Sequence, residues 1–234
     1  MKKAGIIGGV GPASTLDYYG GIISGVREKS NSGDYPRLVI DSVNMAEMIG
    51  YISENKLDKL IGLLTGSIDH LAAAGADFAA IASNTPHIVF ERLNERSKIP
   101  LISIVDATCQ YAAQAGCRRA VVLGTRFTMR SGLYSGALER YGIEAVLPDE
   151  RMQNQVHGII FPNLEDGIVL PEDKAKLIEI SGKLISSSKA DALVLGCTEL
   201  PLAIKPGDID TMLLDTMRIH IEAIVREILS EAKS

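Results

Sequence analysis

Short, fully apolar runs alternate along this chain with longer stretches in which apolar residues recur every three or four positions. The short runs are typical of buried parallel strands, and the longer stretches are typical of helices that pack against them. We therefore expect an α/β fold in which strands and helices alternate. In the first half, the pattern predicts strands at 4–9, 37–42, 78–82 and 100–105, the last closing on Asp106, and helices at about 14–29, 56–75 and 86–95.

The pattern then repeats. Residues 118–125 resemble 2–9, residues 190–199 resemble 76–85, and the run that closes on Asp215 resembles the run that closes on Asp106. Because the three matches occur in the same order, we infer an internal duplication. The first α/β domain is expected to contain residues 1–110 and 215–234, with a last helix at 217–232, and the second residues 111–214.

Each half places a small nucleophilic side chain at the end of one predicted strand. An Ala-Asp pair opens the apolar run, and the sixth residue after the Asp is Ser83 in the first half and Cys197 in the second. Open parallel sheets bind their ligands at the carboxyl ends of the strands. The duplication can therefore place the two side chains on opposite sides of one pocket.

Composition narrows the class of protein. The chain has 234 residues, 46% of them hydrophobic, a net charge of −5 and no basic cluster, so we expect a globular enzyme that binds neither nucleic acid nor membrane. No apolar run is long enough to span a bilayer, which predicts a cytoplasmic protein. Three cysteines without a CxxC pair and four scattered histidines predict neither a disulfide framework nor a metal site.

The glycine-rich segment at 8–12 allows three interpretations. Backbone N–H groups near Gly9 and Gly11 can bind a small anion at the start of the next helix. The segment can instead be a tight turn. A dinucleotide site is the third interpretation, because Asp41 ends the next strand, but the third glycine of that motif is absent and Pro12 interrupts the expected start of the helix.

The two strand ends that carry Ser83 and Cys197 also resemble helix caps, because Ser, Asn and Thr are preferred there. The position of Cys197 near a helix N-terminus predicts a lowered thiol pKa. Cys109 and Cys117 lack that setting and are expected to be structural. We expect His87 and His220 to be buried histidines whose hydrogen bonds are satisfied.

Four motifs together resemble the aspartate/glutamate racemase family, over nearly the whole chain. They are Gly-Gly-x-Gly-Pro at 8–12, Asn-Thr-x-His at 84–87, Leu-Gly-Thr-x-x-Thr-Met at 123–129 and Gly-Cys-Thr-Glu at 196–199. The resemblance implies two similar domains, each a parallel four-stranded sheet flanked by helices, related by a pseudo-twofold axis, with the active site in the interdomain cleft. It also implies a homodimer that racemises a small amino-acid substrate without a cofactor.

Racemisation removes the α-proton on one face of the substrate and returns a proton to the other, so each domain is expected to supply one acid/base group. The resemblance assigns these roles to Cys197 and, in the place of the usual first cysteine, Ser83. It further implies a substrate-binding set, in which backbone N–H groups stabilise the enolate: Gly9, Gly11, Asn84, Thr85, Thr125, Thr198 and Glu199.

Ser83 is a departure from the family pattern, because a serine hydroxyl is a weaker acid and base than a tuned thiol. Two alternatives therefore stay open: a single-cysteine decarboxylase or isomerase of the same superfamily, and a non-catalytic amino-acid-binding relative. A second departure concerns the substrate side chain. Where aspartate enzymes often have a basic residue, this chain has Tyr51 and an acidic segment at 164–167, which leaves Arg126 and Arg130 as the nearest candidate cations.

Overall fold

The computed structural model describes residues 1–30 and 33–230, and its backbone forms two compact units. Unit 1 contains the chain up to Ile104 and resumes at Met217, whereas unit 2 contains Val105–Thr216. The sequence pattern predicts these boundaries after residues 110 and 214. The first boundary falls earlier because helix α5 (Ile104–Gln114) belongs almost entirely to unit 2.

Unit 1 is built on a parallel four-stranded sheet with the order β2-β1-β3-β4. Strand β1 is buried at every residue, and so is β3, as expected for central strands covered on both faces. Its elements, in chain order, are β1 (Ala4–Gly8), α1 (Pro12–Lys29), β2 (Leu38–Ser42), α2 (Met45–Ser53), α3 (Leu57–Ala73), β3 (Phe78–Ile81), the 3₁₀ helix η1 (Thr85–Val89), α4 (Phe90–Arg96), β4 (Leu101–Ile102) and α11 (Thr216–Leu229).

Unit 2 repeats this topology with the order β6-β5-β7-β8, again with parallel neighbours. The prediction of two parallel four-stranded sheets flanked by helices is therefore confirmed. After α5, its elements are β5 (Arg119–Leu123), α6 (Arg126–Arg130), α7 (Leu133–Arg140), β6 (Glu144–Val146), α8 (Glu150–Ile159), the π-helical turn η2 (Ile160–Leu164), α9 (Pro171–Ser188), β7 (Ala192–Leu195), α10 (Leu200–Ala203) and β8 (Met212–Asp215).

The repeated Ala-Asp pair has the same structural role in both units. The Asp77 carboxylate accepts a hydrogen bond from the Lys3 backbone N–H at 2.6 Å, just before β1. The Asp191 carboxylate accepts two, from the backbone N–H groups of Arg118 and Arg119 at 2.8 and 3.0 Å, at the start of β5. Each aspartate thus ties the start of its strand to the neighbouring central strand, which aligns the two strands in register.

The third sequence match, which equates Asp106 with Asp215, is wrong, because the two aspartates do not occupy equivalent positions in the structure. Strand β4 ends at Ile102 rather than at 105, and Asp106 lies in the first turn of α5, where a carboxylate interacts favourably with the helix N-terminus and also pairs with Arg140 at 3.2 Å. The sheet registers instead make Ser103 the counterpart of Asp215, which does end β8.

Two helix boundaries also differ from prediction. Pro12 does not interrupt α1 but begins it, because the first turn of a helix has no partner for the N–H group that proline lacks. The stretch predicted as one helix at 86–95 is split into η1 and α4 at Phe90. The predicted end of the last helix at Ala232 lies outside the described residues.

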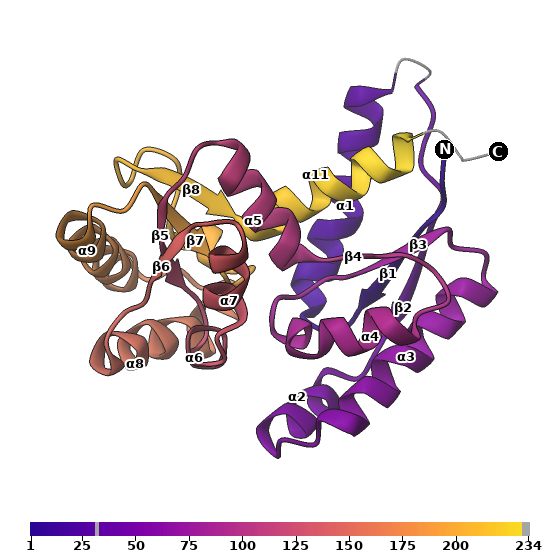
Figure 1. Ribbon diagram of the computed structural model, residues 1–234, viewed down its shortest axis with the longest axis horizontal. Helices are drawn as coiled ribbons and strands as arrows, with labels where there is room; N and C mark the ends of the chain where they lie inside the picture. The colour runs from indigo at the N-terminus through magenta and orange to yellow at the C-terminus, as the bar shows by residue number, and fades with distance from the viewer. Residues whose placement is uncertain (31–32, 231–234) are drawn as a thin grey trace. The chain divides into compact units, whose positions relative to one another are not determined.

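Helix α11 completes the core of unit 1, and it runs beside α1 in Figure 1. A Cβ atom at Gly21 would lie 2.9 Å from Ile221 of α11, and one at Gly25 would lie 3.0 Å from Val225. The two glycines therefore allow the helices to approach closely, and Ile224, a core residue of α11, is fully buried.

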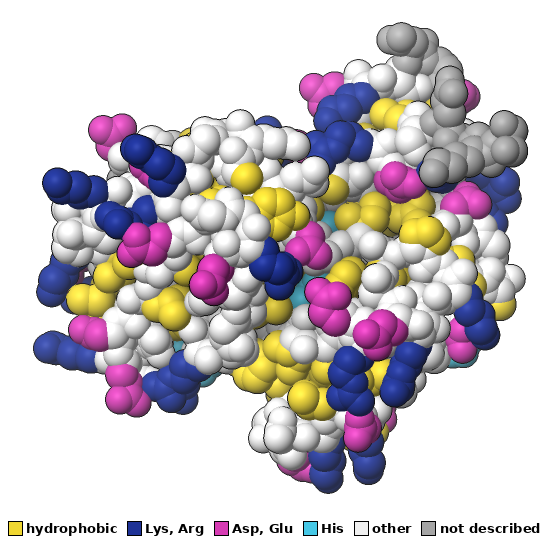
Figure 2. Space-filling view, in the orientation of Figure 1, with side chains coloured by type: hydrophobic (Ala, Val, Ile, Leu, Met, Phe, Trp, Pro, Cys, Tyr) yellow, Lys and Arg dark blue, Asp and Glu magenta, His cyan; other side chains and the backbone are white. Residues whose placement is uncertain are grey.

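The surface carries charges of both signs. Lys and Arg side chains are interspersed with Asp and Glu side chains on the face shown in Figure 2. Within residues 1–30 and 33–230, no helix combines the length and apolar character needed to cross a membrane. In the same residues, no three His, Cys, Asp or Glu side chains are grouped in a way that could hold a metal ion.

Candidate active site

Cys197 follows the carboxyl end of β7 by two residues, at the edge of the sheet where parallel folds bind ligands. The backbone just before it is held tightly, because the Gly196 N–H donates to the Leu123 carbonyl at 2.7 Å. A Cβ atom at Gly196 would lie 2.8 Å from the same carbonyl oxygen, so this position requires glycine. The result is a thiol whose backbone is anchored to the central strand β5.

Glu199 is hydrogen-bonded to both of its polar neighbours. The Cys197 Sγ–H group donates to Glu199 Oε2 at 2.8 Å, and the Thr198 hydroxyl donates to Oε1 at 2.7 Å. The Glu199 side chain is itself buried, and so is Cys197. The Gly-Cys-Thr-Glu motif thus folds into a compact cluster in which one carboxylate contacts both the thiol and the hydroxyl.

The thiol pKa is opposite to the sequence prediction. Burial raises the pKa of Cys197 well above its ordinary value, and the negative charge and hydrogen bond of Glu199 raise it further, with a contribution from Glu165. A helix N-terminus is expected to lower the thiol pKa, but α10 has only four residues. Burial among carboxylates is the larger effect, and it raises the pKa. The Cys197 thiol is therefore protonated at neutral pH.

Glu165 is a second carboxylate near this cluster. It follows η2, and its pKa is raised to about 7 by burial and by the charges of Glu199 and Asp166. From the sequence, the acidic segment that contains Glu165 bears only on the substrate side chain. A glutamate that lies far along the chain from the motif gives no sequence signal of its electrostatic contact with Cys197.

Ser83 holds the corresponding position in unit 1, two residues after β3. The Ala82 N–H donates to the Ile7 carbonyl at 3.0 Å, as Gly196 does to Leu123 in unit 2. Ser83 is half-buried, and Asn84, which follows it, is buried. Thr85 is the first residue of η1, whose first turn receives no side-chain cap from Asn84.

The glycine-rich loop of unit 1 lies against the Ser83 segment. The Ser14 hydroxyl contacts the carbonyl oxygens of both Gly11 and Ala82, at 2.9 and 3.1 Å. Gly9 has a φ of +73°, and a Cβ atom there would lie 2.3 Å from the Val43 carbonyl oxygen. Its N–H donates to the Thr15 hydroxyl at 3.0 Å. The geometry of Gly9 therefore fits the tight-turn interpretation, with its N–H already hydrogen-bonded.

The predicted residues thus form one group in each unit. In unit 1, the Ser14 hydroxyl connects the Gly11 carbonyl to that of Ala82, which directly precedes Ser83, Asn84 and Thr85, whereas Gly9 contacts Thr15. In unit 2, Glu199 contacts both Cys197 and Thr198. Thr125 of unit 2 has a structural contact as well, since its hydroxyl accepts the Thr128 N–H at 3.2 Å and caps α6.

The two candidate cations differ in their surroundings. Arg130 donates to Glu150 at 2.8 Å and to Gln153 at 3.0 Å, so helix α8 engages its guanidinium. Arg126 is exposed at the start of α6, and its charge lowers the pKa of His157, which burial lowers more strongly. Neither arginine is among the residues whose charges act on Cys197.

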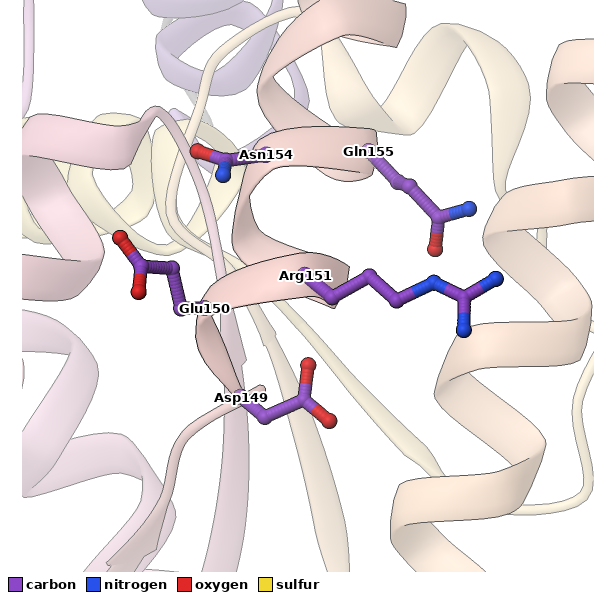
Figure 3. A pocket seen from close by; sticks show the side chains of 5 residues that line it. All are labelled: Asp149, Glu150, Arg151, Asn154 and Gln155. Carbon is purple, nitrogen blue, oxygen red and sulfur yellow. The ribbon is translucent and has the colours of Figure 1, made fainter.

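A broad depression of about 810 Å³ lies along α8. Figure 3 shows Arg151 and Gln155 on one side of the helix, Glu150 and Asn154 on the other, and Asp149 at its start. The Asp149 carboxylate accepts the Met152 N–H at 2.8 Å and caps the helix. None of the lining residues belongs to the Cys197 cluster or to the predicted site.

Two buried histidines support unit 1. The Ile104 N–H donates to His87 Nε2 at 3.3 Å. His220 Nε2 lies 3.0 Å from the Ile102 carbonyl and must donate to it, so Nδ1 accepts from the Tyr18 hydroxyl at 2.7 Å. Burial lowers the pKa of His87 to about 4 and that of His220 to about 3. Both rings are therefore neutral at neutral pH and hold the backbone near β4.

Comparison with known proteins identifies the family of this chain. The family model for Asp/Glu/Hydantoin racemases matches residues 7–224. The chain belongs to this family. The chain is 30% identical over 153 residues to the broad specificity amino-acid racemase RacX of Bacillus subtilis (strain 168), a match that covers 64% of this chain and 66% of RacX, just under two thirds of its length.

Two solved structures extend the likeness to the whole chain. One is described as an aspartate racemase homologue from Pyrococcus horikoshii OT3, with 36% identity and a TM-score of 0.85, covering 98% of this chain and 100% of that one. The other is the Picrophilus torridus aspartate racemase, with 26% identity and a TM-score of 0.75, covering 100% and 96%. RacX and the Picrophilus torridus protein are named as racemases, which are isomerases.

The buried histidines predict how stability depends on pH. Their pKa values in the folded chain lie below the ordinary value of 6.5, so below that pH the unfolded chain binds protons that the folded chain does not. Stability should therefore fall on acidification from about pH 6.5, by about 2 kcal/mol per histidine at about pH 5.

Urea unfolding at about pH 7 and about pH 5 measures this loss. In His220→Asn, the difference between the two pH values should be smaller than in the native chain by about 2 kcal/mol. His70, an exposed histidine that lies 3.4 Å from Asp41, provides the matched control, and His70→Asn should keep most of the native difference. An unchanged difference in His220→Asn would contradict the assignment of a neutral buried ring.

Proposed function

We propose that this protein is a cofactor-independent amino-acid racemase that uses the two-sided proton-transfer mechanism of the aspartate/glutamate racemase family. Cys197 acts as one acid/base group and Ser83 stands in the place of the second. The observation that carries the proposal is the matched placement of the two side chains, each two residues beyond a central strand of a duplicated fold. Family membership supports the reaction class.

The reaction requires a base on one face of Cα and an acid on the other, together with stabilisation of the enolate that forms between the two proton transfers. Backbone N–H groups near Asn84, Thr85 and Thr198 are the candidates for binding the α-carboxylate, because fixed donors stabilise charge as it develops. In the free enzyme Cys197 is the protonated partner, which suits donation of a proton to the carbanion. A homodimer, expected from the family resemblance, and a cytoplasmic location, expected from the apolar pattern of the sequence, also belong to the proposal.

A one-sided reaction is the second candidate, and Ser83 is the observation that favours it. An alkoxide is costly to form at neutral pH, so a reaction in which only Cys197 handles a proton, such as decarboxylation followed by protonation, needs no acid/base chemistry at Ser83. Deuterium exchange at Cα in heavy water separates the candidates. A racemase both labels and inverts a single-enantiomer amino acid, whereas a one-base enzyme labels with retention.

Cys197→Ala should lower Cα exchange by at least about 10²-fold, the usual contribution of a general acid/base group. Circular dichroism should show an unchanged fold. Cys109→Ala is the matched control, because Cys109 is also a buried thiol, with a pKa that burial raises to about 12, and it lies in α5 away from the motif. Full exchange in the Cys197 variant would refute the proposed mechanism.

Ser83→Cys should raise turnover and make the two directions more alike, because a thiol replaces the weaker acid and base. In the native enzyme, one enantiomer should exchange its α-proton faster than the other. Initial deuterium incorporation measured separately from the D- and L-forms tests both statements. Equal native rates would show that Ser83 does not limit the reaction.

The charges described around Cys197 bear on the substrate side chain. Glu165 and Glu199 are both acidic and act on the thiol, and Arg130 is engaged by α8. A second substrate carboxylate near such groups would be repelled and left without a partner. This supports a neutral or cationic side chain over that of aspartate or glutamate.

A panel of aspartate, glutamate, alanine and lysine tests this preference by Cα exchange. Alanine or lysine should exchange faster than either acidic amino acid. Glu165→Gln should raise the exchange rates of aspartate and glutamate and so narrow the difference between the acidic and the other amino acids. Glu144→Gln is the control, because it removes an exposed carboxylate that pairs with Arg119 at 2.6 Å, and it should leave the difference unchanged. Fastest exchange with aspartate would instead support an acidic substrate, and Arg126→Ala would then be expected to raise its KM.

A further inference from the structure

His87 closes the Asn-Thr-x-His motif and takes no part in the proposed proton transfers. Its side chain is only 4% exposed and stacks on Phe90, with ring centroids 5.1 Å apart and an angle of 10° between the ring planes. The His87 backbone N–H donates to the Asn84 carbonyl at 3.0 Å. Burial, stacking and this hydrogen bond together fix the ring within the turn that follows Ser83.

The hydrogen bond at Nε2 determines which ring nitrogen carries the proton. The Ile104 backbone N–H donates to His87 Nε2 at 3.3 Å, and an N–H group can only donate, so Nε2 is unprotonated. Burial lowers the pKa of His87 to about 4, so the ring is neutral at neutral pH. A neutral imidazole keeps one proton, which is therefore on Nδ1. Nδ1 is a hydrogen-bond donor.

This donor is buried next to the backbone that carries Ser83. The carbonyl groups of Ser83 and, more weakly, Asn84 act on the ring and oppose the fall of its pKa. Because Nε2 is engaged by Ile104, these carbonyls face Nδ1. No described residue accepts a well-aligned hydrogen bond from Nδ1, so the expectation of satisfied hydrogen bonds holds for Nε2 alone. An unpaired buried donor is destabilising, which favours closer approach of the Ser83 carbonyl to the ring.

We propose that His87 is a positioning residue for Ser83: its Nδ1–H group holds the Ser83 carbonyl and so sets the direction of the Ser83 hydroxyl at the edge of the sheet. The inference rests on the proposed function, in which that hydroxyl stands in the place of the second acid/base group. His87 does not itself take the hydroxyl proton, because Nε2 is engaged by Ile104 and Nδ1 already carries a proton.

Only one of the two proton transfers should therefore depend on His87. Cys197 is anchored in the other unit, through the Gly196 N–H and the Leu123 carbonyl, and it can remove and return the α-proton on its own face. That exchange proceeds with retention, whereas inversion also requires Ser83. Loss of the His87 donor should lower inversion far more than retention. A variant that merely reduced the amount of folded enzyme would lower both rates equally.

The first experiment measures the tautomer and needs no substrate. Heteronuclear NMR at about pH 7 on protein labelled at the histidine nitrogens distinguishes the two neutral forms of each ring. His87 should carry its proton on Nδ1. His220 should carry its proton on Nε2, which donates to the Ile102 carbonyl. The signals lost in His87→Gln and in His220→Asn identify the two rings. A proton on Nε2 of His87 would overturn the proposal.

The second experiment compares two amides at this position. In His87→Gln, the longer side chain can still accept from the Ile104 N–H but has no donor at the place of Nδ1. In heavy water, its ratio of inversion to exchange with retention should fall at least about tenfold, since a misplacement of about 1 Å can cost about 10²-fold in rate. His87→Asn keeps a donor near the place of Nδ1, and its ratio should stay closer to that of the native enzyme.

His220→Asn is the matched control, because His220 is also a buried neutral histidine of unit 1 but contacts Tyr18 and Ile102. Its ratio of inversion to retention should equal the native one, even if both rates fall. An unchanged ratio in His87→Gln, or a fall in His87→Asn as large as in His87→Gln, would count against the positioning role. If one of the two variants does not fold, the other decides by its own ratio.

The outcomes separate this role from the proposed function. If the native enzyme inverts no amino acid among aspartate, glutamate, alanine and lysine, the racemase proposal fails, and the role of His87 fails with it whatever the tautomer. If the native enzyme inverts one of them and His87→Gln keeps the native ratio, the racemase proposal stands and only the role of His87 is wrong.

Discussion

Parallel pairing of the two central strands in each unit determines where chemistry can occur. In unit 1, β3 pairs with β1, and in unit 2, β7 pairs with β5, and the four strands are almost completely buried. Polar side chains are costly inside such a sheet, so the first polar residues after each strand lie at its carboxyl edge. Asp77 and Asp191 secure the opposite ends by hydrogen bonds to the backbone of the neighbouring strand. Ser83 and Cys197 are placed by this pairing.

Electrostatics gives the two edges different chemical characters. The Cys197 edge is buried and surrounded by carboxylates, so its thiol is held protonated. The Ser83 edge is supported by neutral histidines, whose low pKa values leave them uncharged at neutral pH. A duplicated backbone therefore carries two chemically unlike side chains, a thiol and a hydroxyl, at equivalent positions. In the proposed racemase, this asymmetry would make the two enantiomers react unequally.

The duplication was visible in the sequence because its signal is local. An Ala-Asp pair, an apolar run and a small nucleophile recur at fixed spacing, and each feature has the same structural cause in both halves. The match between Asp106 and Asp215 failed for the opposite reason. An aspartate after an apolar run can end a strand or begin a helix. The ion pair of Asp106 with Arg140 joins two residues that are far apart in the sequence, so the local pattern does not reveal it.

The sequence by itself determined the alternation of strands and helices, the two similar domains and the positions of Ser83 and Cys197 at strand ends, because periodicity and spacing record burial along the chain. Only the tertiary structure decided the protonation state of Cys197. The proximity of Cys197 to a helix start suggested a lowered pKa, but burial and the charge of Glu165, which is distant in sequence, raise it. Desolvation and charge act through space, so their balance is set by which residues the fold brings together.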